Sequence, residues 1–267
     1  MSLKTKYGQL ALIAGASEGI GEAFSHYLAA QGMELILIAR REEPLKTLAN
    51  KLSDTYNIHV ECLPFDLSTP TAAADLTQKL EGRSIDIFVY NAAVSYIGPF
   101  EKQSIADHTQ LAHLNMITPL NLVHSIGNKM LKKGKGAVII MASMAGLQGT
   151  GFIASYAATK AFDRVLAESL WYEWKNRGVD VMACIAGATT TPGYLKSNPA
   201  KLKVGGPSLQ TADQVVKECF DNLGKRPSFI SGRSNRFASF LMQRLFPRKW
   251  AVNIIGNTTT KMYGLKN

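Results

Sequence analysis

Two groups of residues in this 267-residue chain could carry chemistry. The first is the turn Gly15–Gly21, which reads GASEGIG and lies between an apolar run and a helical pattern. The second is the set Ser143, Tyr156 and Lys160. A glycine-rich turn can hold a dinucleotide pyrophosphate at a helix N-terminus, and serine, tyrosine and lysine can move a proton to or from an alcohol or carbonyl. Each group alone is a weak signal, but together and in this order they indicate hydride transfer.

Each glycine of the turn has a distinct physical role. Gly15 allows the tight turn, Gly19 leaves room for the backbone to approach phosphate, and Gly21 permits close packing of helix on strand. The alternative is a glycine-rich turn that binds no ligand. The strand before the turn and the helix after it favour nucleotide binding, because the motif needs that context.

The end of the second apolar run selects between the two nicotinamide cofactors. An acidic residue there binds the ribose hydroxyls and favours NAD. This chain has Ala39 followed by Arg40 and Arg41, which can form charge-assisted bonds to a 2′-phosphate. NADP(H) is therefore favoured over NAD(H). The alternative is that the two arginines are merely exposed after a strand and bind no phosphate. Glu18 argues against NADP(H), because it brings a negative charge near the same phosphate region.

Tyr156 and Lys160 are four residues apart in a helical stretch, so they share one helix face. An unperturbed tyrosine, with a pKa of about 10, is a poor acid–base group at neutral pH, and a nearby lysine cation favours its phenolate. Tyr156 is predicted to protonate a carbonyl oxygen or to accept the proton of an alcohol, with Ser143 positioning that oxygen. The alternative is an ordinary surface pair, which the accompanying motifs make less plausible.

Short apolar runs alternate with helical patterns along the chain, and the runs are continuous, as in parallel strands buried on both faces. This pattern predicts an α/β fold: a doubly wound parallel sheet (Rossmann fold) in a single domain, with a basic helical C-terminal tail. We expect a catalytic domain over residues 1–231, a substrate lid at about 189–210, and an extension over 232–267 that packs on the same domain. The expected strands are Leu10–Ala14, Met33–Ala39, Ile58–Leu63, Ile85–Tyr90, Ala137–Ala142, Val179–Ile185 and Ser228–Ser231. The expected helices are Gly21–Gln31, Glu42–Thr55, Thr71–Leu80, Asp107–Lys132, Ala154–Asn176 and Ala212–Asn222.

From Leu10 to about Ser231 the chain resembles the short-chain dehydrogenase/reductase family. The resemblance assigns Asp66 a place near the adenine ring, and it completes a catalytic tetrad of Ser143, Tyr156, Lys160 and Asn115. It also implies that Lys160 reaches the nicotinamide ribose and that Asn115 holds a water. The chain departs from the family pattern at Ala14, Tyr90, Ala93 and Ala186, where the family has threonine, asparagine, glycine and proline. The predicted cofactor-binding residues are Gly15, Ser17, Glu18, Gly19, Ile20, Gly21, Arg40, Arg41, Asp66, Asn91, Ala92, Ala93, Tyr156, Lys160, Gly187, Thr189 and Thr191.

The net charge of +10 is concentrated near the C-terminus. Up to residue 185 there are 17 basic and 17 acidic residues, whereas the remainder holds 13 basic residues against three acidic ones. This asymmetry suggests a positive face for an anionic cofactor, an acyl carrier or a membrane surface. Nucleic acid is disfavoured because the aromatic residues of the tail have helix-core spacing. The tail is equally compatible with packing on the domain, on a partner subunit, or peripherally on a membrane.

The three cysteines lack metal or redox spacing, which favours reduced thiols in a cytoplasmic protein, and the histidines predict no metal site. The sequence therefore predicts an NADP-dependent carbonyl reductase or alcohol dehydrogenase acting on a small, lipophilic molecule. A 3-oxoacyl thioester, a steroid-like ketone and a simple aldehyde all remain open. The alternative is a non-catalytic NADP-binding sensor or scaffold on the same fold. The resemblance further implies a homodimer or homotetramer.

Overall fold

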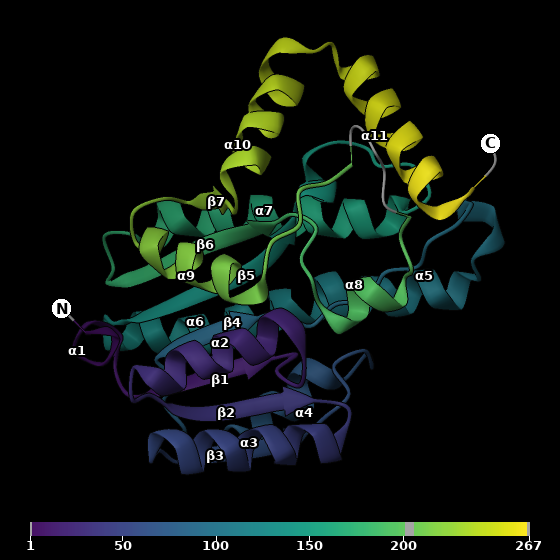
Figure 1. Ribbon diagram of the computed structural model, residues 1–267. Coiled ribbons are helices and arrows are strands. Elements are labelled where there is room, and N and C mark those ends of the chain that lie inside the picture. The colour runs from purple at the N-terminus through teal and green to yellow at the C-terminus, as the bar shows by residue number, and fades with distance from the viewer. Residues whose placement is uncertain (1, 201–205, 266–267) are drawn as a thin grey trace.

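The computed structural model describes residues 2–200 and 206–265, and its core is one seven-stranded parallel sheet. The strand order is β3-β2-β1-β4-β5-β6-β7 (Figure 1), which confirms the predicted doubly wound fold. All seven expected strands are present, with ends shifted by at most two residues. They are β1 (Leu10–Ala14), β2 (Glu34–Ala39), β3 (Val60–Pro64), β4 (Ile87–Tyr90), β5 (Gly136–Ser143), β6 (Val179–Ala186) and β7 (Ser228–Ile230).

Helices cover both faces of the sheet, which explains why the strands are continuously apolar. Alternate residues of β1 enter two separate cores: Ala11 and Ile13 face one, and Leu12 and Ala14 face the other. The first core is closed by α2 (Gly19–Ala30), α3 (Glu42–Tyr56) and α9 (Ala212–Asn222). The second is closed by α4 (Ala72–Lys79), α6 (Thr118–Lys133) and α7 (Ala154–Trp174).

The single helix predicted over Asp107–Lys132 is wrong, because the structure divides it into three parts. A helix α5 (Ile105–Ala112) is followed by a π-helical turn at His113–Ile117, and α6 follows directly. Pro119, at the start of α6, lacks the amide hydrogen that would continue the α-helical ladder back to Asn115. Such π-turns often occur at functional positions, and Asn115 lies within this one.

The chain also begins with a short helix that the sequence reading did not anticipate, α1 (Leu3–Tyr7). The Ser2 side chain caps it by accepting a hydrogen bond from the Thr5 amide at 3.2 Å. Its last two residues, Lys6 and Tyr7, both donate to the Asp180 carboxylate, at 2.7 and 2.6 Å. These long-range contacts give the segment an order that its local sequence pattern does not reveal.

The predicted lid at 189–210 contains a five-residue helix, α8 (Pro192–Lys196), that was not expected. An isolated parallel bridge between Thr189 and Gln210 joins the two ends of the segment. The Ala200 amide donates to the Met262 carbonyl at 2.8 Å, so the segment is also attached to the C-terminal helix. Residues 201–205 of the predicted lid, which include the apolar Leu202 and Val204, lie outside the described residues.

The tail after β7 forms two helices rather than one helix and an apolar cluster. Figure 1 shows α10 (Arg233–Phe240) leading away from the sheet and α11 (Arg248–Tyr263) running back toward α8 and α5. A π-helical turn at Leu241–Leu245 extends α10, and this helical segment ends before Pro247. Ala251 of α11 is buried, whereas Phe240 and Trp250 are exposed. Within residues 2–200 and 206–265, no helix is both long and apolar enough to span a bilayer.

Candidate nucleotide-binding and catalytic site

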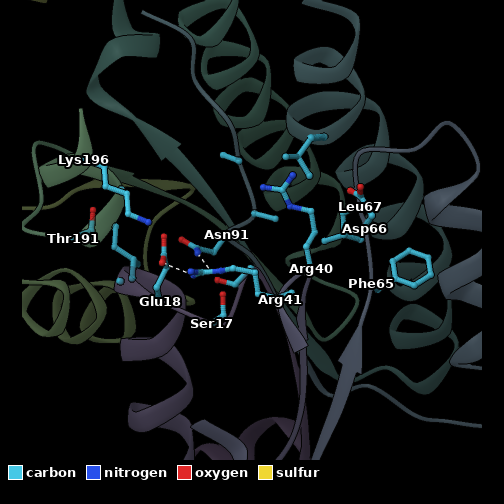
Figure 2. A pocket seen from close by; sticks show the side chains of 18 residues that line it. Ser17, Glu18, Arg40, Arg41, Phe65, Asp66, Leu67, Asn91, Thr191 and Lys196 are labelled. Carbon is cyan, nitrogen blue, oxygen red and sulfur yellow. Dashed lines mark hydrogen bonds and ion pairs between the residues drawn. The ribbon is translucent and has the colours of Figure 1, made fainter. Parts of the chain in front are cut away.

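A pocket of about 510 Å³ opens at the carboxyl ends of β1, β2 and β4 (Figure 2). This is the position where the strand order reverses, since β1 pairs with β2 on one side and β4 on the other. Ligands of doubly wound sheets bind at this switch point. The lining residues are Gly15, Ser17, Glu18, Gly19, Ile20, Ala39, Arg40, Arg41, Phe65, Asp66, Leu67, Asn91, Ala92, Ala93, Leu114, Thr191, Gly193 and Lys196.

The glycine turn forms the floor of this pocket, and its local geometry explains its composition. Gly15 and Gly19 have φ values of +82° and +63°, which disfavour other residues. A Cβ on Gly21 would lie 1.9 Å from the Gly15 carbonyl oxygen, so α2 can approach the strand only with glycine there. The Gly15 carbonyl also accepts a hydrogen bond from Asn91 Nδ2 at 2.9 Å. The open amides at the start of α2 therefore face the pocket, as an anion requires.

The end of β2 supplies positive charge, but its two arginines are not equivalent. Arg41 Nη2 donates to Glu18 Oε2 at 2.5 Å, so this pair neutralises the carboxylate that weakened the NADP prediction. Arg40 also lines the pocket, and no ion pair involves it within the described part of the chain. Arg40 is therefore the better candidate for direct contact with a 2′-phosphate.

Asp66 lines the far side of the pocket beside Phe65 and Leu67 (Figure 2). Its Oδ1 accepts hydrogen bonds from the amide and the hydroxyl of Ser68, at 2.9 and 2.7 Å. These two bonds fix the orientation of the carboxylate. The placement agrees with the adenine-side role that the resemblance assigns to Asp66.

Lys160 of α7 lies almost completely buried below Tyr156. Its Nζ is 5.9 Å from the centre of the Tyr156 ring, and it donates to the Met141 carbonyl at 2.8 Å and to Asp163 Oδ2 at 2.9 Å. Burial alone lowers the pKa of Lys160, but the Asp163 carboxylate and Tyr156 outweigh it, so the pKa lies above its ordinary value. Lys160 is therefore protonated at neutral pH. Burial raises the pKa of Asp163, an effect that Lys160 only partly offsets.

Ser143 is the last residue of β5, and Asn115 lies in the π-helical turn. Ser143 Oγ accepts a hydrogen bond from the Ala145 amide at 3.2 Å. The buried Asn115 side chain exchanges two 2.9 Å hydrogen bonds with the backbone of Val94 and donates to Thr159 Oγ1 at 3.3 Å. Asn115 thus connects the loop after β4 to α7. Its partner in α7 is Thr159, the residue that precedes Lys160.

The segment after β6 brings only one of its three predicted residues into the pocket. Thr191 lines it, and a Cβ on Gly19 would lie 2.9 Å from the Thr191 methyl carbon. The Thr189 side chain instead donates to the Gly187 carbonyl at 3.1 Å and is buried. Gly187 packs against Asn235, whose Nδ2 would lie 2.4 Å from a Cβ at that position.

The structure therefore gathers most of the predicted cofactor residues around one pocket, whose lining does not include the acid–base residues. Those that do not line the pocket are Gly21, Asn115, Ser143, Tyr156, Lys160, Gly187 and Thr189. Sequence reasoning did not include six of the lining residues among its predicted site residues: Ala39, Phe65, Leu67, Leu114, Gly193 and Lys196. Ala39 was named only as the position that lacks a carboxylate, and Phe65 and Leu67 flank the predicted Asp66. Leu114 precedes the predicted Asn115, so its position was available as a signal. The sequence offered no signal for Gly193 and Lys196, because the helix that carries them, α8, was not predicted. Within the described residues no group of His, Cys, Asp and Glu side chains could hold a metal ion.

Comparison with known proteins agrees with this architecture. The family model for short chain dehydrogenases matches residues 9–201. A 7beta-hydroxysteroid dehydrogenase of Clostridium sardiniense is 34% identical over 236 residues, which cover 88% of this chain and 90% of the relative. A solved structure from work on the stereoselectivity of 7beta-hydroxysteroid dehydrogenase superposes with a TM-score of 0.90 at 30% identity, covering 96% of this chain and 100% of the other. A short-chain dehydrogenase from Sphingobium yanoikuyae in complex with NADPH superposes with a TM-score of 0.76 at 28% identity, covering 87% and 92%.

Proposed function

Because the chain belongs to the short-chain dehydrogenase family, we propose that it is an NADP(H)-dependent hydroxysteroid dehydrogenase. It interconverts a secondary alcohol and a ketone on a steroid-like, lipophilic molecule. The observation that carries the reaction class is the pocket at the sheet's switch point, together with Tyr156 above a buried, protonated Lys160. Of the three substrate classes that the sequence leaves open, the full-length likeness to 7beta-hydroxysteroid dehydrogenases favours the steroid-like ketone.

The described residues fit a nicotinamide dinucleotide. The start of α2 offers open amides to a pyrophosphate, Asp66 lies at the adenine side, and Arg40 provides a cation for a 2′-phosphate. The Glu18–Arg41 ion pair supports the choice of NADP(H), because it removes the carboxylate that would repel that phosphate. Ala39, which lines the pocket where an NAD site has an acidic residue, supports the same choice.

The bound cofactor supplies or accepts a hydride, and the chain's own residues handle the proton. Tyr156 donates its hydroxyl proton to the carbonyl oxygen, or accepts a proton from the alcohol in reverse. Ser143 donates a hydrogen bond to the same oxygen and so orients it. Two of the three Lys160 ammonium hydrogens are bound to Met141 and Asp163, which leaves one for the cofactor ribose.

The cofactor preference is tested by titrating NADPH and NADH against the wild type and Arg40→Ala. A charge-assisted contact with phosphate contributes about 1.5–3 kcal/mol, so the variant should lose roughly 10- to 100-fold in NADPH affinity. Its NADH affinity should stay unchanged. Equal affinity of the wild type for the two cofactors, or no loss in the variant, would contradict the NADP(H) assignment.

The reaction is tested by following NADPH absorbance with a steroid that carries a 7-keto group, and NADP⁺ reduction with the 7β-alcohol. Tyr156→Phe should reduce kcat by about 10²- to 10⁴-fold, since it removes the acid–base proton. NADPH affinity should change little. A wild type that binds NADPH tightly but turns over neither steroids nor simple diketones would favour the non-catalytic sensor or scaffold instead.

We also expect a homodimer or homotetramer. Exposed apolar side chains on α5 and α7 support this proposal: Ile105 is 81%, Val165 50% and Tyr172 69% exposed. Light scattering coupled to size-exclusion chromatography measures the assembly directly. A Val165→Glu, Tyr172→Glu double variant should dissociate it, because the introduced carboxylates would be buried without partners.

A further inference from the structure

Lys196 is a cation of the nucleotide pocket that belongs to no sequence motif. It is the last residue of α8, in the segment predicted as a lid, and it lines the pocket together with Thr191 and Gly193. Figure 2 shows Lys196 on the same side of the pocket as Thr191 and Glu18, with its amino group turned toward the pocket interior. Asp66 and Phe65 lie on the other side.

The backbone that carries Lys196 is held at both ends. Before it, Thr191 caps α8 by accepting a hydrogen bond from the Tyr194 amide at 3.2 Å, and its methyl group lies directly over Gly19. After it, the Ala200 amide donates to the Met262 carbonyl of α11 at 2.8 Å. The lysine is therefore presented from a fixed position above the start of α2. Its flexible four-carbon stem can adjust to a ligand.

The charges around the pocket give Lys196 a role distinct from that of the arginines. Arg41 is paired with Glu18, and Arg40 follows β2 at the ribose side. Within residues 2–200 and 206–265, no ion pair involves Lys196. A dinucleotide places its pyrophosphate at the N-terminus of α2, next to Gly19. That position adjoins Thr191, since a Cβ on Gly19 would lie 2.9 Å from the Thr191 methyl carbon, and the nearby Arg41 is already paired with Glu18.

We propose that Lys196 binds the cofactor pyrophosphate from the side of α8. This inference deepens the proposed function and rests on it. The pyrophosphate is common to NADH and NADPH, whereas the 2′-phosphate occurs only in NADPH. Lys196 therefore contributes to the affinity for both cofactors equally, and Arg40 sets the preference between them.

The test is a fluorescence titration of NADH and NADPH against the wild type, Lys196→Met and Lys196→Arg. Lys196→Met should weaken both cofactors by the same factor, about 5- to 20-fold for a partly solvated charge-assisted contact. The NADPH-to-NADH affinity ratio should stay constant. Lys196→Arg should bind within about threefold of the wild type, because it keeps the positive charge. Lys132→Met is the matched control, since it removes one exposed positive charge from the end of α6 that lies away from the pocket.

Three results would overturn the inference while leaving the enzyme intact. One is unchanged affinity for both cofactors in Lys196→Met. Another is a loss confined to NADPH, which would place Lys196 at the 2′-phosphate. The third is a loss that disappears in a Glu18→Gln background, because Lys196 would then act only by neutralising Glu18. A wild type that binds neither cofactor would refute the proposed function itself. The wild-type titration is therefore done first, so that this outcome is distinguished from an effect of Lys196 alone. Thermal melting of each variant shows whether it is folded.

Discussion

Replacing Gly21 by alanine tests whether the glycine turn is shaped by close contact between α2 and the strand before it. The new Cβ would lie 1.9 Å from the Gly15 carbonyl oxygen and 2.8 Å from Asn91 Nδ2. The first distance is about 1.5 Å short of ordinary van der Waals contact. The obstructing atom is backbone, and the Gly15 amide is itself bound to the Ile38 carbonyl at 2.8 Å. The turn therefore cannot move aside without losing contacts.

The expected cost combines two effects. Overpacking of this kind costs about 1–3 kcal/mol, and loss of the Asn91 hydrogen bond to Gly15 costs about 0.5–1.5 kcal/mol. The free energy of unfolding should fall by about 2–4 kcal/mol, which corresponds to a drop of about 5–10 °C in Tm for a chain of this size. NADPH affinity should fall by about tenfold or more, because the displaced turn no longer aims its amides at the pyrophosphate.

Gly193→Ala is the matched control for this substitution. Gly193 lines the same pocket, but a Cβ there meets no atom within 4 Å and its φ is not positive. This variant should melt and bind NADPH like the wild type. Both variants are measured by thermal denaturation and by NADPH titration. The packing argument fails if Gly21→Ala retains the wild-type Tm and NADPH affinity.

Three further outcomes follow from contacts remote from the pocket. Burial and the hydrogen-bonded Asp180 carboxylate raise the pKa of Tyr7 above its ordinary value, so the stability that Tyr7 contributes is complete below about pH 10 and is lost as the pH rises further. Between pH 10 and 11 the wild type should lose about 1 kcal/mol more unfolding free energy than Tyr7→Phe, measured by urea denaturation; parallel losses would contradict this. Gly127→Ala should destabilise by about 1–3 kcal/mol, because its Cβ would lie 2.3 Å from the buried Trp174 ring, and an unchanged Tm would show that the ring can shift freely. Gly256→Ala in α11 meets no atom within 4 Å and should raise the free energy of unfolding by about 0.5–1 kcal/mol, because alanine favours a helix interior over glycine; a lower Tm would contradict this.

The sheet could be predicted because its signals are local. Most strands are continuous apolar runs bounded by turns, and β1 and α2 flank a turn whose glycines have recognisable spacing. The fold class and the positions of the strands followed from these patterns. The nucleotide pocket followed as well, because the carboxyl ends of parallel strands meet at one edge.

The parts that escaped prediction depend on contacts distant in sequence. The π-helical turn around Asn115 depends on Pro119 and on hydrogen bonds to Val94, which no helical periodicity encodes. Helix α8 is a short element between the glycine turn and α11, and its own sequence has no apolar repeat. Lys196 therefore looked like one more basic residue of the C-terminal region until α8 placed it in the pocket.

Asp163 shows most clearly why a catalytic motif describes only part of an acid–base site. The Tyr156 and Lys160 spacing predicts a lysine beside a tyrosine, but the residue one further helical turn along decides the charge of that lysine. A fully buried lysine without a partner tends to lose its proton, because burial penalises the ammonium. Here the Asp163 carboxylate, itself fully buried and 2.9 Å from Nζ, keeps the pKa of Lys160 above its ordinary value. The protonation state of Lys160 is therefore set by neighbours on one face of α7, and the motif names Tyr156 but not Asp163.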